Sequence, residues 1–427
     1  MRGIGFNTYY SDYWWKMCRP TEPDVEREAR KALETSEKKT KTGKRKREER
    51  IQQAIDRGDV KGGGKSQTYH SREAFEEDLL TADISMFKAV KNKFHCDGTH
   101  LRLFDAAKMC EGIRKDHRRR GPVYSRRSRS APPTSKAPEE LKPIFWSSKR
   151  VANDLGYTVV PKEDLKTLPG DSFSVYDVNG RAVLYSLANY FGRGSVREYT
   201  SSLLELATQV KLSTCQADAK TRGANYSFVD GRPVGCVNFT HCWRGLGGKK
   251  GDLKPSASSV NGGNTGVTKS ATTFNSIQGH HQKSRKYNTL VNMAIYRLHE
   301  PGFWAYLRMS TTIRKRLPAA AAIATHDPAF STGKSVIYSR NTPLHFDNKE
   351  APEGWSPLIV MGTCKTGMLS IPRLGIKFPY LPGHLVLLRG RLLDHEVIEW
   401  DGKDIRICIA HFTHVDEWSF AGIVPPL

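Results

Sequence analysis

The second half of the chain is a series of short apolar runs separated by turn residues. Some runs alternate apolar and polar positions, as in Ile405–Phe412, and others are continuously apolar, as in Leu385–Leu388. Both patterns are typical of β-strands with one or two buried faces. The strands predicted in this way are 335–339, 345–347, 356–363, 368–371, 385–388, 395–398 and 405–412. Because no βαβ alternation separates them, we expect an α+β fold with a double-stranded β-helix (jelly-roll) core flanked by helices.

A hairpin and helices are predicted upstream of these strands. Phe173–Tyr185 contains two strand-like runs around Asn179-Gly180, which is a strong hairpin turn. Apolar residues at helical spacing predict a helix over Ser202–Val210. A second helical stretch is expected in residues 287–316, interrupted at Pro301-Gly302 and ended by Pro318.

Gly245–Gly279 is rich in Gly, Ser, Thr, Asn and Lys and poor in apolar residues. We interpret it as a long functional or disordered loop. The adjacent His280 and His281 are expected on its surface, because neighbouring residues in a strand point to opposite faces and make a poor metal pair.

The first third of the chain has a different composition. Residues 21–59 are highly charged and predict a solvated helix, whereas Arg114–Lys136 is dominated by Pro, Ser and Arg, as in a disordered basic linker. We therefore predict two regions: a basic, partly helical and partly disordered N-terminal extension, residues 1–140, and a folded domain, residues 141–427.

The net charge of the chain indicates which class of molecule it binds. The 427 residues include 67 Lys and Arg against 44 Asp and Glu, a formal net charge of +23. This excess favours a polyanion, with nucleic acid ahead of an anionic membrane. The side chains expected to contact DNA phosphates, without reading sequence, are Arg118, Arg119, Arg120, Arg126, Arg127, Lys249 and Lys250.

Other features bear on the compartment. Lys41–Arg47 resembles a nuclear localisation signal, although such a run can also be a solvated charged surface. The eight Cys are irregularly spaced and no secretory signal is evident, so we expect reduced thiols. No apolar stretch is long enough to cross a membrane. We predict a nuclear, monomeric protein without a membrane segment.

Asn341–Asp347 is the most chemically distinctive segment. On a strand, His345 and Asp347 point to the same face and supply two ligands of the two-His, one-carboxylate triad that binds non-haem Fe(II). His395 is the best third ligand, with His384 and His411 as alternatives. Arg406 follows on an alternating strand, where a guanidinium suits the far carboxylate of 2-oxoglutarate.

These residues resemble the TET/JBP family of nucleobase dioxygenases, particularly its compact fungal and protist members. The resemblance covers about residues 141–427 and is strongest over 336–418. It implies Fe(II) on His345, Asp347 and His395, with 2-oxoglutarate on Arg406 and with help from Arg340. It also implies a flipped base stacked on Phe412 and hydrogen-bonded by His414, in duplex DNA and with O2 as co-substrate.

The family pattern departs at the polar residue three positions after the iron Asp. Here that residue is Glu350, with Asn348 nearby, so both are candidate base contacts and the preferred base stays open. The resemblance favours oxidation of 5-methylcytosine to 5-hydroxymethylcytosine and further oxidised forms. N6-methyladenine demethylation and thymine hydroxylation are alternatives, as is a non-catalytic DNA-binding protein with the same fold.

Overall fold

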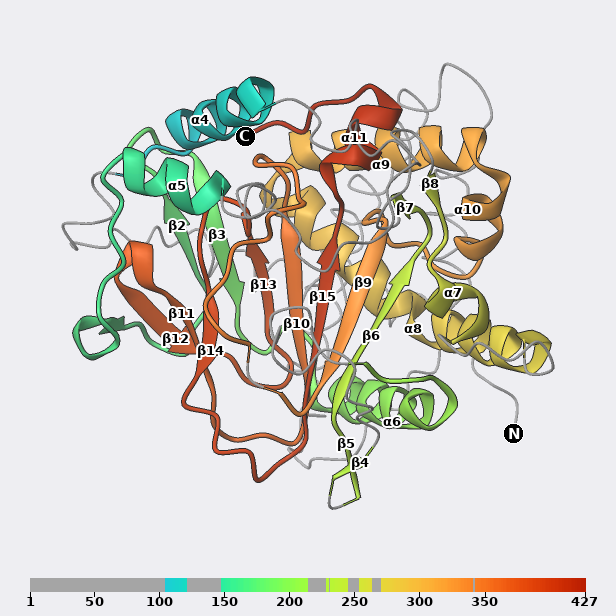
Figure 1. Ribbon diagram of the computed structural model, residues 1–427. Coiled ribbons are helices and arrows are strands. Elements are labelled where there is room, and N and C mark those ends of the chain that lie inside the picture. Colours follow the sequence, from blue (N-terminus) through green and yellow to red (C-terminus); the bar gives the residue numbers. More distant parts are fainter. Residues whose placement is uncertain are drawn as a thin grey trace, which may run out of the picture.

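The computed structural model describes residues 104–120, 147–213, 228–229, 231–244, 253–262, 270–340 and 342–427. Figure 1 shows a broad, twisted sheet with a smaller sheet on one side and helices on the other. The broad sheet is antiparallel, in the order β2-β3-β13-β10-β15-β9-β6. Its strands are β2 (Phe173–Tyr176), β3 (Ala182–Leu187), β13 (Leu385–Leu388), β10 (Ser356–Gly362), β15 (Arg406–Phe412), β9 (Gly333–Tyr338) and β6 (Gly235–Thr240).

The smaller sheet has four strands in the order β1-β12-β11-β14. They are β1 (Lys166–Thr167), β12 (Ile376–Pro379), β11 (Met368–Ile371) and β14 (Glu396–Ile398), and β1 is parallel to β12. Two short hairpins, β4 (Phe228–Val229) with β5 (Arg232–Pro233) and β7 (Trp243–Arg244) with β8 (Leu253–Lys254), lie outside both sheets.

Strand alternation divides the interior into two hydrophobic cores. On β15, Ile407 and Ile409 pack with helices, whereas Cys408 packs with the smaller sheet. The same alternation on β10 places Ile359 in the first core and Leu358 in the second. Since Arg406 and Phe412 share strand parity with Cys408, both belong to the face that looks toward the smaller sheet.

The first core is covered by helices behind the broad sheet (Figure 1). These are α6 (Arg193–Gln209), α8 (Ser270–Leu298) and α9 (Glu300–Arg316). Shorter helices lie at the periphery: α5 (Ser147–Asp154), α7 (Ala257–Asn261), α10 (Pro318–Ile323) and α11 (Val415–Ala421), with 3₁₀ turns η6 (Lys162–Asp164) and η9 (Pro372–Leu374). Within the described residues, none of the helices is long and apolar enough to cross a membrane.

From β9 onward, the chain passes repeatedly between the two sheets. Strands β9 and β10 are in the broad sheet, and β11 and β12 are in the smaller sheet. Strand β13 is again in the broad sheet, β14 in the smaller sheet and β15 in the broad sheet. Between β9 and β10, His345 pairs with His395 in an isolated antiparallel bridge beside β14. This bridge brings two segments far apart in the sequence into direct contact.

Several sequence-based predictions are corrected here. The predicted strand 345–347 is an extended segment with a single bridge, at His345. The predicted loop Gly245–Gly279 contains β8, α7 and the start of α8. His280 and His281 lie within α8 and are buried, not on the surface, because the helix places them over the broad sheet beside Asp327.

The predicted linker from Arg114 is also corrected, because helix α4 (Ala106–Arg120) continues through that position. Met109, Cys110 and Ile113 are buried in the second core, and the Ala106 amide donates to Asp177 Oδ2 at 3.0 Å. The predicted domain boundary at residue 140 therefore assigns α4 to the N-terminal extension, although α4 packs into the folded domain. The rest of the predicted linker and the charged segment 21–59 lie outside the described residues.

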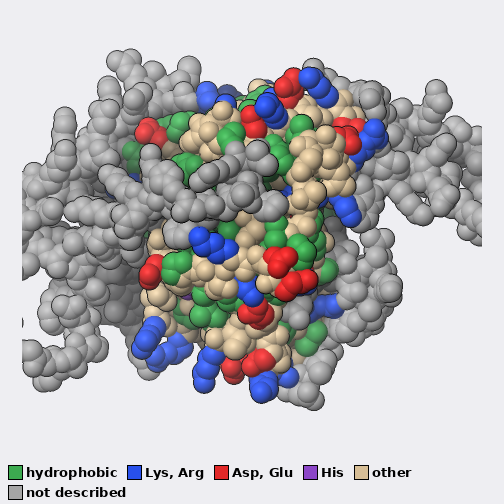
Figure 2. Space-filling model, turned by 90° about the vertical axis from the view of Figure 1, so that its left-hand side faces the viewer, with side chains coloured by type: hydrophobic (Ala, Val, Ile, Leu, Met, Phe, Trp, Pro, Cys, Tyr) green, Lys and Arg blue, Asp and Glu red, His purple; other side chains and the backbone are tan. Residues whose placement is uncertain are grey.

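Figure 2 shows the molecule from the side on the left of Figure 1. In the coloured part of this face, Asp and Glu side chains are interspersed with Lys and Arg. The positive excess of the chain is therefore not concentrated on the described surface that this view shows.

Candidate metal and cofactor site

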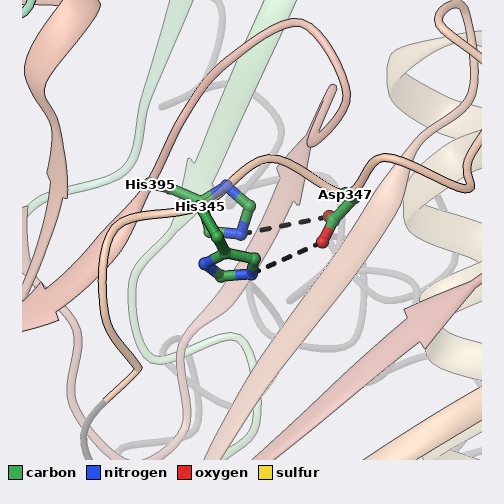
Figure 3. Close-up of side chains that lie close together, drawn as sticks. All are labelled: His345, Asp347 and His395. Atoms are coloured by element: carbon green, nitrogen blue, oxygen red, sulfur yellow. Dashed lines mark ion pairs between the residues drawn. The ribbon is translucent and has the colours of Figure 1, made fainter. Parts of the chain in front are cut away.

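The His345–His395 bridge brings together the three predicted metal ligands. One ligand atom each from His345, Asp347 and His395 lies within 4.8 Å of the others, and no other such group of three His, Cys, Asp or Glu occurs among the described residues. His345 Nε2 is 3.5 Å from Asp347 Oδ1, and His395 Nε2 is 3.9 Å from Oδ2. Figure 3 shows both imidazoles facing the same carboxylate. The alternatives His384 and His411 are not part of this group.

Backbone contacts orient both imidazole rings. His345 Nδ1 lies 2.9 Å from the Pro343 carbonyl, and His395 Nδ1 lies 3.1 Å from the Leu393 carbonyl. A carbonyl only accepts, so each Nδ1 carries a proton, which leaves Nε2, on the side of Asp347, as the atom available to a metal. This tautomer and a fixed ring orientation are what a histidine needs to bind a metal.

The titration behaviour follows from burial and mutual charge. Burial, followed by the neighbouring His345, lowers the pKa of His395 to about 4. Burial alone would raise the pKa of Asp347, but His395 and His345 hold it below its usual value. Burial would lower the pKa of His345, yet Asp347 raises it above the usual value. The cluster therefore contains an ionised carboxylate between two imidazoles.

The Asp347 carboxylate occupies space that any side chain at position 390 would fill, and residue 390 is a glycine. A Cβ on Gly390 would lie 2.0 Å from Asp347 Oδ2 and 2.7 Å from Ser356 Oγ. The Asp347 amide donates to the Gly390 carbonyl at 3.0 Å, and Ser356 Oγ donates to Asp347 Oδ2 at 3.1 Å. The sequence offers no indication of this contact, because it depends on two loops meeting.

Arg406 extends from the first residue of β15 into the space between the sheets. Only 1% of its surface is exposed, and its guanidinium lies 5.2 Å from the centre of the Tyr380 ring. Nη1 donates to the Arg340 carbonyl at 3.3 Å, whereas Nε and Nη2 have no hydrogen-bond partner in the described part of the chain. The charges of Arg406 and Asp347 both affect the nearby Cys408: burial raises the pKa of its thiol, Arg406 lowers it and Asp347 raises it.

The residues fit the predicted cofactors. Two imidazole Nε2 atoms and a carboxylate form the donor set that Fe(II) takes with open positions opposite. A buried guanidinium with two unpaired nitrogens is costly unless an anion binds it, and a carboxylate of 2-oxoglutarate supplies that charge. The Arg340 carbonyl accepts a hydrogen bond from the same guanidinium.

The predicted base-contact residues adjoin the triad. Glu350 and His414 form an isolated bridge, and the Glu350 amide donates to the Asp347 carbonyl at 2.9 Å. The Glu350 carboxyl is buried and shares a hydrogen bond with Ser356 Oγ, and burial, followed by the charge of Asp347, raises its pKa well above the usual value. Asn348 is half-buried, and its Oδ1 has no hydrogen-bond partner within the described ranges.

Phe412 and His414 are stacked on one another, and a third ring continues the row. The first two rings are 5.0 Å apart at 16°, and Trp243 lies 6.4 Å from His414 at 26°. All three are half-buried. Inserting a base between two rings would take a separation of about 7 Å, twice the rise of stacked bases. The Phe412 and His414 rings are therefore too close together for a base to enter between them.

Trp243 was not identified from the sequence, where it precedes a glycine-rich segment without any distinguishing pattern. It lies on β7, which is fixed to α11 by an ion pair of 3.0 Å between Arg244 Nη2 and Asp416 Oδ2. The connection from β7 to β8 contains the predicted phosphate contacts Lys249 and Lys250, which lie outside the described residues, as do Arg126 and Arg127. Arg118, Arg119 and Arg120 form the end of α4.

A second buried His–Asp cluster lies on the opposite, helix-covered face of the broad sheet. Asp327 Oδ2 accepts from Lys334 Nζ at 2.9 Å and faces His241 Nε2 at 3.3 Å. Asp327 Oδ1 accepts from Asn288 Nδ2 at 2.7 Å and from the Ala329 amide at 3.1 Å. Burial would raise the pKa of Asp327, but Lys334 and His241 hold it well below its usual value.

His411 belongs to this second cluster. It contacts Asn288 Oδ1 through Nε2 at 3.1 Å, one strand position away from Phe412 but on the other face of the sheet. This position explains why it cannot join the triad.

No family model and no curated protein matches the chain. Among solved structures, the chain is similar to NgTET1 in complex with 5mC DNA, with 13% identity over 60% of this chain and 84% of that chain and a TM-score of 0.38. At this level of overlap the likeness carries no information on the chemistry of this chain.

Proposed function

We propose that this protein is an Fe(II)- and 2-oxoglutarate-dependent dioxygenase that oxidises a methylated base in duplex DNA after flipping it. The favoured reaction converts 5-methylcytosine to 5-hydroxymethylcytosine and further oxidised forms. The observation that carries the proposal is the combination of the triad with Arg406, a buried cation whose Nε and Nη2 have no hydrogen-bond partner in the described part of the chain.

The strand order supports the proposed jelly-roll core. We number the segments along the chain from 1 (β9), with the His345 bridge as segment 2 and β15 as segment 8. Segments 6, 3, 8 and 1 then lie side by side in the broad sheet, and segments 5, 4, 7 and 2 lie side by side in the smaller sheet. This alternation is that of a double-stranded β-helix. In such a fold His345, Asp347 and His395 would lie at one end of the space between the sheets, where a metal would be shielded.

Each residue then has a defined task. His345, Asp347 and His395 would hold Fe(II), and Arg406 would bind the far carboxylate of 2-oxoglutarate, with Arg340 beside it. The bound metal and cofactor, together with O2, supply the oxidation of a methyl C–H bond. The protein orients the methyl group, excludes water and fixes the proton on each imidazole Nδ1.

A base inside a duplex cannot reach a metal within the protein, so the target base would be flipped out of the helix. It would then stack on the aromatic row formed by Phe412, His414 and Trp243. His414, Glu350 and Asn348 are the polar groups available to read its edge. The basic segments would contact phosphates and so contribute affinity without base preference. We propose nuclear action, since Lys41–Arg47 resembles an import signal.

Mass spectrometry of nucleosides tests this proposal. Full-length protein with Fe(II) and 2-oxoglutarate is incubated with duplexes that contain only 5-methylcytosine, N6-methyladenine or thymine. Oxidised 5-methylcytosine is the expected main product. A product from N6-methyladenine or thymine alone would support the alternative substrates. DNA binding without consumption of 2-oxoglutarate would support a non-catalytic binding protein.

A further inference from the structure

Arg373 connects the two segments that carry the metal ligands. It is the middle residue of η9, and only 3% of its surface is exposed. Its Nε lies 3.2 Å from Asp394 Oδ2, and Asp394 immediately precedes His395. Its guanidinium lies 5.4 Å from the centre of the Phe346 ring, and Phe346 stands between His345 and Asp347.

A planar guanidinium is suited to this double contact, because its edge pairs with a carboxylate while its face lies on an aromatic ring. A third contact fixes the plane of the group, since Nη2 donates to Asn153 Oδ1 of α5 at 3.2 Å. Burial strengthens both the ion pair and the cation–π contact relative to water. Arg373 therefore contacts both ligand segments from outside the site.

We propose that Arg373 is a positioning residue of the metal centre: it holds the His345–Asp347 segment against the His395 segment, so that the three ligand atoms are placed before a metal binds. This inference rests on the proposed metal site, but not on the identity of the DNA base. Removing the supporting contacts of metal ligands commonly lowers metal affinity by about 10–100-fold.

Two other cations provide matched controls. Lys162 Nζ lies 2.9 Å from Glu396 Oε2, on the other neighbour of His395. It tests whether any ion pair beside His395 has the same effect. Arg314 is buried on the helix-covered face and donates to the carbonyls of Asp327 and Ala329. It tests whether loss of any buried arginine weakens the metal site through general destabilisation.

The experiment titrates full-length wild type, Arg373→Met, Lys162→Met and Arg314→Met with Co(II) and Mn(II). Affinity is measured by calorimetry, and Co(II) geometry by visible absorption. We expect Arg373→Met to bind about 10–100-fold more weakly with an altered Co(II) spectrum, and both controls to bind like wild type. Arg373→Lys, which keeps the charge but not the planar face, should fall in between and replaces Arg373→Met if that variant does not fold.

Wild-type affinity and spectrum in Arg373→Met, or in Arg373→Lys where it stands in, would overturn the inference while leaving the metal centre intact. Equal weakening in Arg373→Met and Arg314→Met would also overturn it, because the effect would then be general destabilisation. A wild-type protein that binds neither ion would refute the proposed metal centre itself.

Discussion

Two carboxylates, the buried Asp327 and the half-buried Asp347, lie on opposite faces of the broad sheet and differ in how their charge is neutralised. Asp327 has a cation of its own, Lys334, and its two oxygens accept further hydrogen bonds from Asn288 and Ala329. Asp347 has no Lys or Arg within ion-pair distance among the described residues, and faces two imidazole Nε2 atoms at 3.5 and 3.9 Å.

This difference distinguishes a structural cluster from a candidate binding site. A buried charge must be paired or must coordinate a metal. The protein supplies the missing charge at Asp327, whereas at Asp347 it supplies aligned ligand atoms and no cation. The same reasoning applies to Arg406, a cation whose anion is not found in the described part of the chain.

The largest effect is expected from Asp347→Ala, which removes the carboxylate of the triad. Turnover and tight binding of Fe(II) should both be abolished with the fold retained. Asp327→Asn is the control: it should lower stability but leave metal affinity unchanged. Metal titration and circular dichroism of the two variants check this contrast. Full activity of Asp347→Ala would refute the assignment of the triad.

Arg406→Ala should be next in size. Losing a buried charged partner costs about 3–5 kcal/mol, or roughly 10²–10³-fold in affinity. The variant should therefore need 2-oxoglutarate at concentrations higher by orders of magnitude, with metal binding little changed. Steady-state kinetics against 2-oxoglutarate measure this. An unchanged requirement would mean that another residue binds the cofactor.

Lys334→Met should reveal the structural role of the second cluster. It leaves Asp327 buried without its cation, so we expect a loss of about 3–5 kcal/mol in the free energy of unfolding. The double variant Lys334→Met/Asp327→Asn should lose less, because no unpaired charge remains. Urea denaturation measures both. Co(II) affinity that falls together with stability would contradict the independence of the two faces.

The same face should make the protein sensitive to acid. Burial, followed by the charge of Lys334, lowers the pKa of His280 to about 3 and that of His411 to about 4. The unfolded chain, with an ordinary histidine pKa of about 6.5, therefore takes up protons first as the pH falls. The contribution of these two histidines to the free energy of unfolding should be constant above about pH 7 and should decrease from about pH 6.5 toward pH 4. Urea midpoints at several pH values check this dependence.

The smallest effect is expected in the aromatic row. His414→Ala should reduce the single-turnover rate most for the preferred base, and Trp243→Ala should reduce it less, because Trp243 contacts His414 from one side only. Stacking contributes about 1–3 kcal/mol per base. Phe412→Ala should impair all bases equally. Rates on every base that are unchanged in His414→Ala would show that the base binds elsewhere.

The strands were predictable because their information is local. The predicted runs 368–371 and 385–388 coincide with β11 and β13, since apolar residues there are consecutive and turns bound them. β6 and β12 were missed because short mixed sequences become strands only through their partners. The burial of His280 and His281 was also missed, because Asp327 and Lys334, which surround them, are distant in the sequence.

The candidate site divides in the same way. His345, Asp347, His395 and Arg406 could be selected from residue type and strand spacing. Gly390, Ser356, Trp243 and Arg373 could not, because each acts through a contact between segments that only the folded chain brings together. The phosphate contacts Arg126, Arg127, Lys249 and Lys250 stay predictions.

The docking of α4 gives the N-terminal region a defined point of attachment. Arg114 forms an ion pair with Glu353, three residues from Glu350, and α4 ends six residues later. Helix α4 is thereby held beside the segment that carries Glu350. A polyanion held by one part of a tethered chain meets the other part at a high effective concentration, set by linker length and not by bulk DNA. If DNA is the proposed substrate, basic residues joined to α4 would raise its local concentration at the site in this way.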